Sequence, residues 1–61
     1  MPHNLSTKYY RITFNSTERL ANEIFTYAIH KVEAIQIVAQ YWKDRYEKDY
    51  GKITKIVSVK E

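Results

Sequence analysis

Hydrophobic residues recur every three or four positions between residues 31 and 50, which is the period of an amphipathic α-helix. The apolar stripe comprises Val32, Ile35, Val38, Ala39, Trp42 and Tyr46, widened by Ala34 and Tyr41. Opposite charges four residues apart, such as Lys43 and Glu47, mark the other face as exposed. Gly51 follows where a left-handed residue commonly ends a helix. The pattern predicts one helix over 31–50, with His30 where Ser or Asp is the usual N-cap.

Three other stretches are rich in β-branched and aromatic residues, which favour strands. They cover residues 8–14, 23–29 and 52–60. In the first stretch the residues on one side are Tyr10, Ile12 and Phe14. In the last, strict alternation places Ile53, Lys55, Val57 and Val59 on one face and Thr54, Ile56 and Ser58 on the other. Residues 1–7 are polar and are expected to form a loose leader.

The order strand, strand, helix, strand predicts a single α+β domain of ββαβ type. A right-handed crossover through the helix places the third strand beside the first. We therefore expect a three-stranded antiparallel sheet of order 2-1-3, with the helix on one face.

A second interpretation of the same residues is a strand, a long helix and a strand. Apolar residues also step by three and four without a break through residues 17–50. Such a helix would be about 50 Å long, whereas strands of seven residues span only about 23 Å. The helix would overhang its sheet and need a partner chain to cover it, so the hairpin is the preferred interpretation.

The amino-acid composition excludes several classes of function. The chain has 61 residues, no Cys and a formal net charge of +3. It therefore has no disulfide framework and no thiol metal site, and it contains no phosphate-binding glycine loop, zinc-ligand spacing or nucleophile elbow. No apolar run approaches the roughly 20 residues that span a bilayer, and the first residues lack the apolar core of a signal peptide. We expect a cytoplasmic protein that is not an enzyme and has no metal, cofactor, membrane contact or small-molecule substrate.

The sheet face turned away from the helix is the candidate binding surface. Alternation places four large apolar side chains there: Tyr9, Phe25, Tyr27 and Ile56. An uncovered apolar patch on a small protein usually marks an interaction site. Its occupant is a second copy of the chain, giving a homodimer, or a different protein. A third occupant is single-stranded nucleic acid stacked on the rings, with phosphates near the cations Lys8, Arg11, Lys52 and Lys55.

Residues 30–61 resemble many small phage and plasmid proteins, of which the DpnD/PcfM-like family is one example. The similarity is carried by the Glu33-Ala34-Ile35 helix start, by Gly51 and by the Ile/Val strand with Lys and Glu after it. His30 departs from the Ser usual in those proteins. The resemblance implies a ββαβ unit of mobile-element origin and carries over no catalytic residue.

A second resemblance is to ribbon-helix-helix repressors. The segment 11–14 followed by residues 17–28 is similar to their strand and first helix, and 32–41 to their second helix. This resemblance implies that Arg11 and Thr13 would enter the DNA major groove. The connection over residues 28–31 is shorter than in that family and lacks the usual Gly.

Together these features predict a small binding protein, expected to be dimeric, that binds and modulates or inhibits a host or mobile-element protein without catalysis. The alternative is a small basic nucleic-acid-binding regulator, of ribbon-helix-helix or single-strand-binding type.

Overall fold

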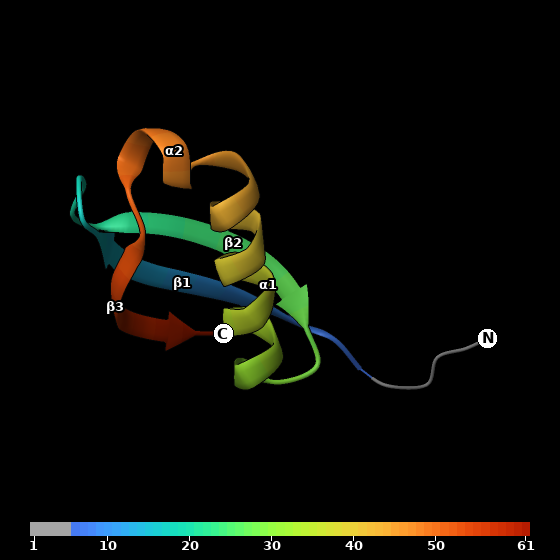
Figure 1. The fold of residues 1–61 in the computed structure, drawn as a ribbon. Coiled ribbons are helices and arrows are strands. Elements are labelled where there is room, and N and C mark those ends of the chain that lie inside the picture. Colours follow the sequence, from blue (N-terminus) through green and yellow to red (C-terminus); the bar gives the residue numbers. More distant parts are fainter. Residues whose placement is uncertain (1–5) are drawn as a thin grey trace.

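A computed structural model describes residues 6–61 and folds them as two strands, two helices and a third strand (Figure 1). The elements are β1 (Lys8–Ser16), β2 (Asn22–Ala28), α1 (Lys31–Arg45), α2 (Glu47–Tyr50) and β3 (Ile53–Lys60). This confirms the expected ββαβ arrangement. Both the long-helix interpretation and the ribbon-helix-helix arrangement require a helix where β2 lies. Residues 1–5 of the predicted leader lie outside the described residues.

The sheet has the order β2-β1-β3, and β1 is antiparallel to both neighbours, as expected. Helix α1 crosses one face of this sheet (Figure 1). The core between them is formed by β1 and α1, with Ala28 at the end of β2. Its buried side chains are Tyr10, Ile12, Phe14, Ala28, Ala34, Val38 and Trp42.

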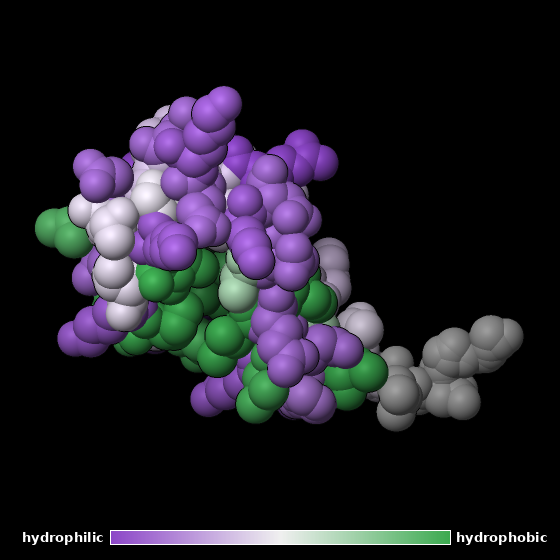
Figure 2. Space-filling model, viewed as in Figure 1, coloured by the Kyte–Doolittle hydropathy of each residue, from purple (hydrophilic) through white to green (hydrophobic). Residues whose placement is uncertain are grey.

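The buried row of α1 is narrower than its apolar stripe. Only Ala34, Val38 and Trp42 of α1 are buried, whereas Val32 is 60% exposed. One helix over a three-stranded sheet needs a single row of side chains to close the core. The exposed side of α1 is mostly hydrophilic, and hydrophobic side chains show beside it over the sheet (Figure 2).

Strand β3 does not follow strict alternation. Its pairing with β1 shifts twice, and Thr54 and Val57 are the residues without a partner at these bulges. Ile53, Ile56 and Val59 consequently all pack against the core. The expectation that Ile56 faces away from the helix is therefore wrong: it pairs with Phe14 on the covered face, and Lys55 moves to the side of its partner Asn15.

The predicted helix over 31–50 is interrupted. Helix α1 ends at Arg45, Tyr46 has the non-helical angles φ −124° and ψ −18°, and α2 follows as a single turn. A straight helix would carry its last turn away from the sheet. The break instead lets Tyr50 pack against the core and brings Gly51 within 2.7 Å of the Trp42 indole Nε1, which donates a hydrogen bond to the Gly51 carbonyl oxygen.

The β1–β2 loop is fastened to the corner at Gly51. The N–H of Thr17 donates to the Lys52 carbonyl oxygen at 3.0 Å, and the N–H of Glu18 donates to that of Tyr50 at 3.2 Å. The buried Ser16 hydroxyl also donates to the Tyr50 carbonyl oxygen, at 2.6 Å. These bonds hold the hairpin end of the sheet against the end of α2.

His30 caps α1 with its imidazole. Its Nδ1 accepts a hydrogen bond from the Glu33 N–H at 3.2 Å, while Oε1 of Glu33 accepts one from the Ile29 N–H at 2.7 Å. The His30 side chain thus satisfies an N–H group that the first turn leaves free, and the Glu33 side chain reaches back to the N–H of the residue before the cap.

We expect His30→Ala to lower the free energy of unfolding by about 1 kcal/mol, because the Glu33 N–H loses its acceptor. His30→Ser restores a hydroxyl acceptor and should retain the stability. Urea unfolding followed by fluorescence of Trp42, the single tryptophan, measures both. Equal midpoints for the Ala variant and the wild type would contradict the capping role.

Candidate binding face

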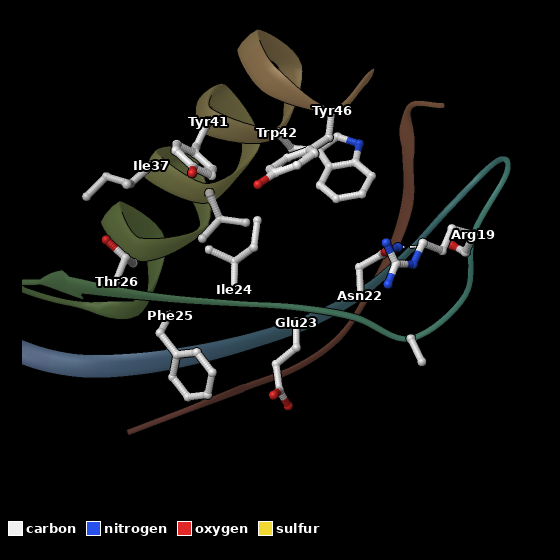
Figure 3. Close-up of a pocket in the computed structure, with 12 residues that line it drawn as sticks. Arg19, Asn22, Glu23, Ile24, Phe25, Thr26, Ile37, Tyr41, Trp42 and Tyr46 are labelled. Atoms are coloured by element: carbon white, nitrogen blue, oxygen red, sulfur yellow. Dashed lines mark hydrogen bonds between the residues drawn. The ribbon is translucent and has the colours of Figure 1, made fainter. Parts of the chain in front are cut away.

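Three aromatic side chains meet on the sheet face opposite α1, and we call them the aromatic face: Tyr9, Phe25 and Tyr27. Tyr9 of β1 pairs directly with Tyr27 of β2, with ring centroids 4.7 Å apart. The Tyr9 and Phe25 rings are stacked, with centroids 5.5 Å apart and planes at 17°. Figure 3 shows Phe25 on the side of β2 opposite to Ile24, which points toward α1.

These rings are exposed as well as clustered. The exposed fractions are 50% for Tyr9, 47% for Phe25 and 65% for Tyr27. The structure thus brings together three of the four residues predicted for this face, and Ile56 is the exception. Val57 is instead the exposed apolar residue of β3, at 53%; alternation gave no signal for it, because it stands at a bulge.

The predicted cations do not gather around the rings. Arg11 flanks the aromatic face but lies 3.6 Å from Glu23. Lys8 pairs with the buried Ala28, which places it on the other side of the sheet, and it lies 3.5 Å from Glu61. Such exposed pairs contribute about 0–1 kcal/mol, yet each places a carboxylate against its cation, so neither pair presents a net positive charge to phosphates.

The other two predicted cations lie toward the far end of the sheet. Lys55 pairs with Asn15, six residues along β1 from Tyr9 and so about 20 Å away. Lys52 precedes β3 at the corner beside Gly51. The four cations therefore do not form one basic patch with the aromatic rings.

A shallow hollow of about 280 Å³ lies beside the aromatic face. It is lined by Tyr9, Arg11, Phe25, Lys60 and Glu61. Ring faces and charged groups of both signs thus border the same depression, which suits a peptide side chain with an apolar stem and a polar end.

A larger groove of about 730 Å³ lies between α1 and β2, on the covered side of the sheet (Figure 3). Its apolar wall includes Ile24 of β2 and the exposed side chains Ile37 and Tyr41 of α1. Tyr46 also lines the groove. Its phenol has a raised pKa, because it hydrogen-bonds with Tyr41 and because a negative charge on Tyr46 would be repelled by one on Tyr41. Tyr46 therefore stays a neutral hydrogen-bonding group.

The groove also contains a buried polar atom. The Asn22 side chain is 5% exposed, and its amide nitrogen donates to the Arg19 carbonyl oxygen at 3.0 Å. Its Oδ1 has no hydrogen-bond partner among the described residues. A single acceptor does not make a catalytic constellation, which needs several converging groups.

Within residues 6–61 there is no cluster of three or more His, Asp or Glu side chains that could hold a metal ion. No helix in that range is long and apolar enough to cross a membrane. The arrangement of these residues can bind through stacked rings and flanking charges. Comparison of the chain with protein-family models, with curated proteins and with solved structures gives no match.

Proposed function

We propose that this chain is a non-catalytic binding protein that recognises another protein through its aromatic face and modulates that protein by occupying its surface. The observation that supports this is the exposed cluster of stacked rings on a sheet face that α1 does not cover. Burying one large apolar side chain is worth about 1.5–3 kcal/mol. Aromatic residues at the centre of an interface carry much of the binding free energy. A host or mobile-element protein as the target rests on the family resemblance.

The surroundings of the rings favour a protein partner over a nucleic acid. Arg11 is paired with Glu23, and Lys60 and Glu61 line the hollow beside Tyr9 and Phe25, so the rim presents both signs of charge. A groove for single strands combines stacking rings with a continuous row of free cations. A mixed rim matches the polar edge of a protein interface.

The test is capture of partners from a host extract with immobilised protein, before and after nuclease treatment. We expect Tyr9→Asp to reduce the recovered protein at least tenfold, because it places a charge in the stacked cluster. Val32→Asp is the matched control: Val32 is an exposed apolar residue on α1, and its replacement should leave recovery unchanged.

Equal recovery by Tyr9→Asp and the wild type would contradict the proposal. So would loss of every partner on nuclease treatment, which would point to the nucleic-acid alternative. Circular dichroism of each variant confirms that the fold is retained.

A further inference from the structure

The two edges of the sheet differ in how they are protected. Strand β2 pairs with β1 through seven consecutive positions without irregularity, and it contains neither Lys nor Pro. Strand β3 carries two bulges together with Lys55 and Lys60. Bulges and lysines are the usual devices that prevent an edge from pairing with another strand. The β2 edge has none of these devices, and its only charged residue is Glu23.

The end of β1 fixes which backbone groups reach that edge. The Thr17 N–H donates to the Lys52 carbonyl oxygen, on the β3 side, at 3.0 Å. The Ser16 N–H donates to the Arg19 carbonyl oxygen, on the hairpin side, at 2.7 Å. Because successive residues of a strand point their N–H and C=O groups to opposite sides, the even-numbered residues of β1 exchange hydrogen bonds with β2.

The partners of those residues on β2 are also even-numbered; Ile12, for example, pairs with Ile24. The N–H and C=O groups of Glu23, Phe25 and Tyr27 therefore point outward from the sheet. This row lies at the edge of the sheet, where such backbone groups are a template for strand addition. One of them, the Tyr27 carbonyl oxygen, accepts a hydrogen bond of 3.4 Å from the Thr26 hydroxyl of its own strand.

We propose that the β2 edge pairs antiparallel with the β2 edge of a second copy of this chain, about a two-fold axis at Phe25. In that register Phe25 faces Phe25 of the second copy, and Glu23 faces its Tyr27. Every outward N–H and C=O group of these three residues then finds a partner. The single charge of the strand meets a neutral ring rather than another carboxylate.

The groove beside the edge accommodates the same strand. A chain laid along β2 directs alternate side chains to the α1 side of the sheet, where Ile24 and Thr26 of the second copy enter the groove of about 730 Å³. Ile37 and Tyr41 of α1 are exposed beside the edge, at 40% and 41%. They become the cover for the inserted side chains.

Exposed aromatic rings beside the edge supply part of the surface that a dimer needs. Phe25, Tyr27 and Tyr41 flank the edge on its two sides, with exposed fractions of 47%, 65% and 41%. At roughly 200 Å² for a whole aromatic side chain, they hold on the order of 300 Å² of exposed surface. A stable interface buries about 800 Å² on each partner, so these rings could supply roughly a third of it, and the paired backbone and the groove would add to it.

This pairing joins two sheets into one of six strands and makes the aromatic faces of both copies continuous. The longer face would extend the surface that the proposed partner can contact. The dimer itself does not depend on the proposed function. Tyr9 lies on the central strand and contributes to the face only. Thr26 lies on the edge and contributes to the pairing only.

The test is the mass of the protein by sedimentation equilibrium across micromolar concentrations. We expect the wild type to approach twice the 7.3 kDa of the chain. Thr26→Lys and Thr26→Glu each place like charges across the two-fold axis and should weaken the dimer at least tenfold. An equimolar mixture of the two variants should form a heterodimer again. Thr54→Lys, the same change on the other edge strand, and Tyr9→Asp should both leave the dimer intact.

A wild-type protein that stays monomeric at high micromolar concentration would overturn this inference. So would Thr26 variants that dimerise as the wild type does, or folded Thr26 variants whose mixture stays monomeric. Because Tyr9→Asp is expected to reduce partner capture at least tenfold without changing the mass, failure of the dimer and failure of the proposed function are separate results.

Discussion

Gly51→Ala should unfold a large fraction of the protein at room temperature. Gly51 has φ 83° and ψ 179°, a region open essentially to glycine alone, where another residue costs of order 1–3 kcal/mol. A Cβ would also overlap the Thr17 hydroxyl oxygen and lie 3.1 Å from Cγ of Glu18. Overpacking of this kind typically costs about 1–3 kcal/mol more. A chain of this length has roughly 3–9 kcal/mol of stability in total.

The loop cannot move aside at low cost, because the Thr17 N–H is bonded to the Lys52 carbonyl oxygen and the Glu18 N–H to that of Tyr50. Urea unfolding followed by Trp42 fluorescence measures the loss. The double variant Thr17→Ala/Gly51→Ala removes the overlap with the hydroxyl oxygen but keeps the close contacts with Cβ of residue 17 and Cγ of Glu18, at 3.0 Å and 3.1 Å, and the backbone strain. It should therefore recover part of the stability. A Gly51→Ala midpoint equal to that of the wild type would contradict this description of the corner.

Trp42→Ala should reduce the free energy of unfolding by about 3–5 kcal/mol, close to the whole stability of a chain this small. The ring is 4% exposed and meets the Phe14 ring edge-on, with centroids 4.9 Å apart and planes at 86°. Its Nε1 also donates to the Gly51 carbonyl oxygen at 2.7 Å. One side chain thus packs the core and holds the turn that leads into β3.

Trp42→Phe separates these two roles. It keeps most of the packed ring but leaves the Gly51 carbonyl oxygen without this donor, at a cost of about 1–3 kcal/mol. Tyr41→Ala, at an exposed aromatic residue of the same helix, should change the stability by about 1 kcal/mol or less. Circular dichroism follows the unfolding, since the only tryptophan is lost. Equal effects of Trp42→Ala and Tyr41→Ala would contradict the central place of this ring.

The regular part of the sheet could be predicted from the sequence. Along β1 and β2 one side carries apolar residues that α1 covers. A shift of the strand register by one residue would expose Tyr10, Ile12 and Phe14 to water. Register is therefore strongly specified there. Tyr9, Phe25 and Tyr27 were predicted on the correct face for this reason.

Strand β3 could not be predicted in the same way. Strict alternation forces either Lys55 inward with Ile53, or Thr54 and Ser58 inward with Ile56. Each choice buries a polar side chain, which is costly without a partner. The two bulges instead bring Ile53, Ile56 and Val59 to the core. Because a bulge depends on how β3 pairs with β1, the local pattern of apolar and polar residues in β3 does not predict it.

The break in the helix at Tyr46 could not be predicted from the sequence for a similar reason. Trp42, Tyr46 and Tyr50 are spaced four residues apart in the sequence, as in a continuous helix. In the structure their rings form a triangle, with Trp42 5.2 Å from Tyr46, Tyr46 6.1 Å from Tyr50, and Trp42 6.0 Å from Tyr50 between centroids. Only the need to return the chain to β3 interrupts the hydrogen-bonding pattern. That need is set by the tertiary fold, not by the residues of the helix.

The most direct measurement of the binding face is site-specific photo-crosslinking in a host extract. A benzophenone-bearing phenylalanine replaces Tyr9 in one preparation and the exposed Val32 of α1 in another. We predict a crosslink from position 9 to a distinct protein that persists after nuclease treatment, and none to that protein from position 32. A crosslink to nucleic acid at position 9, or to the same protein only from position 32, would contradict a protein-binding aromatic face.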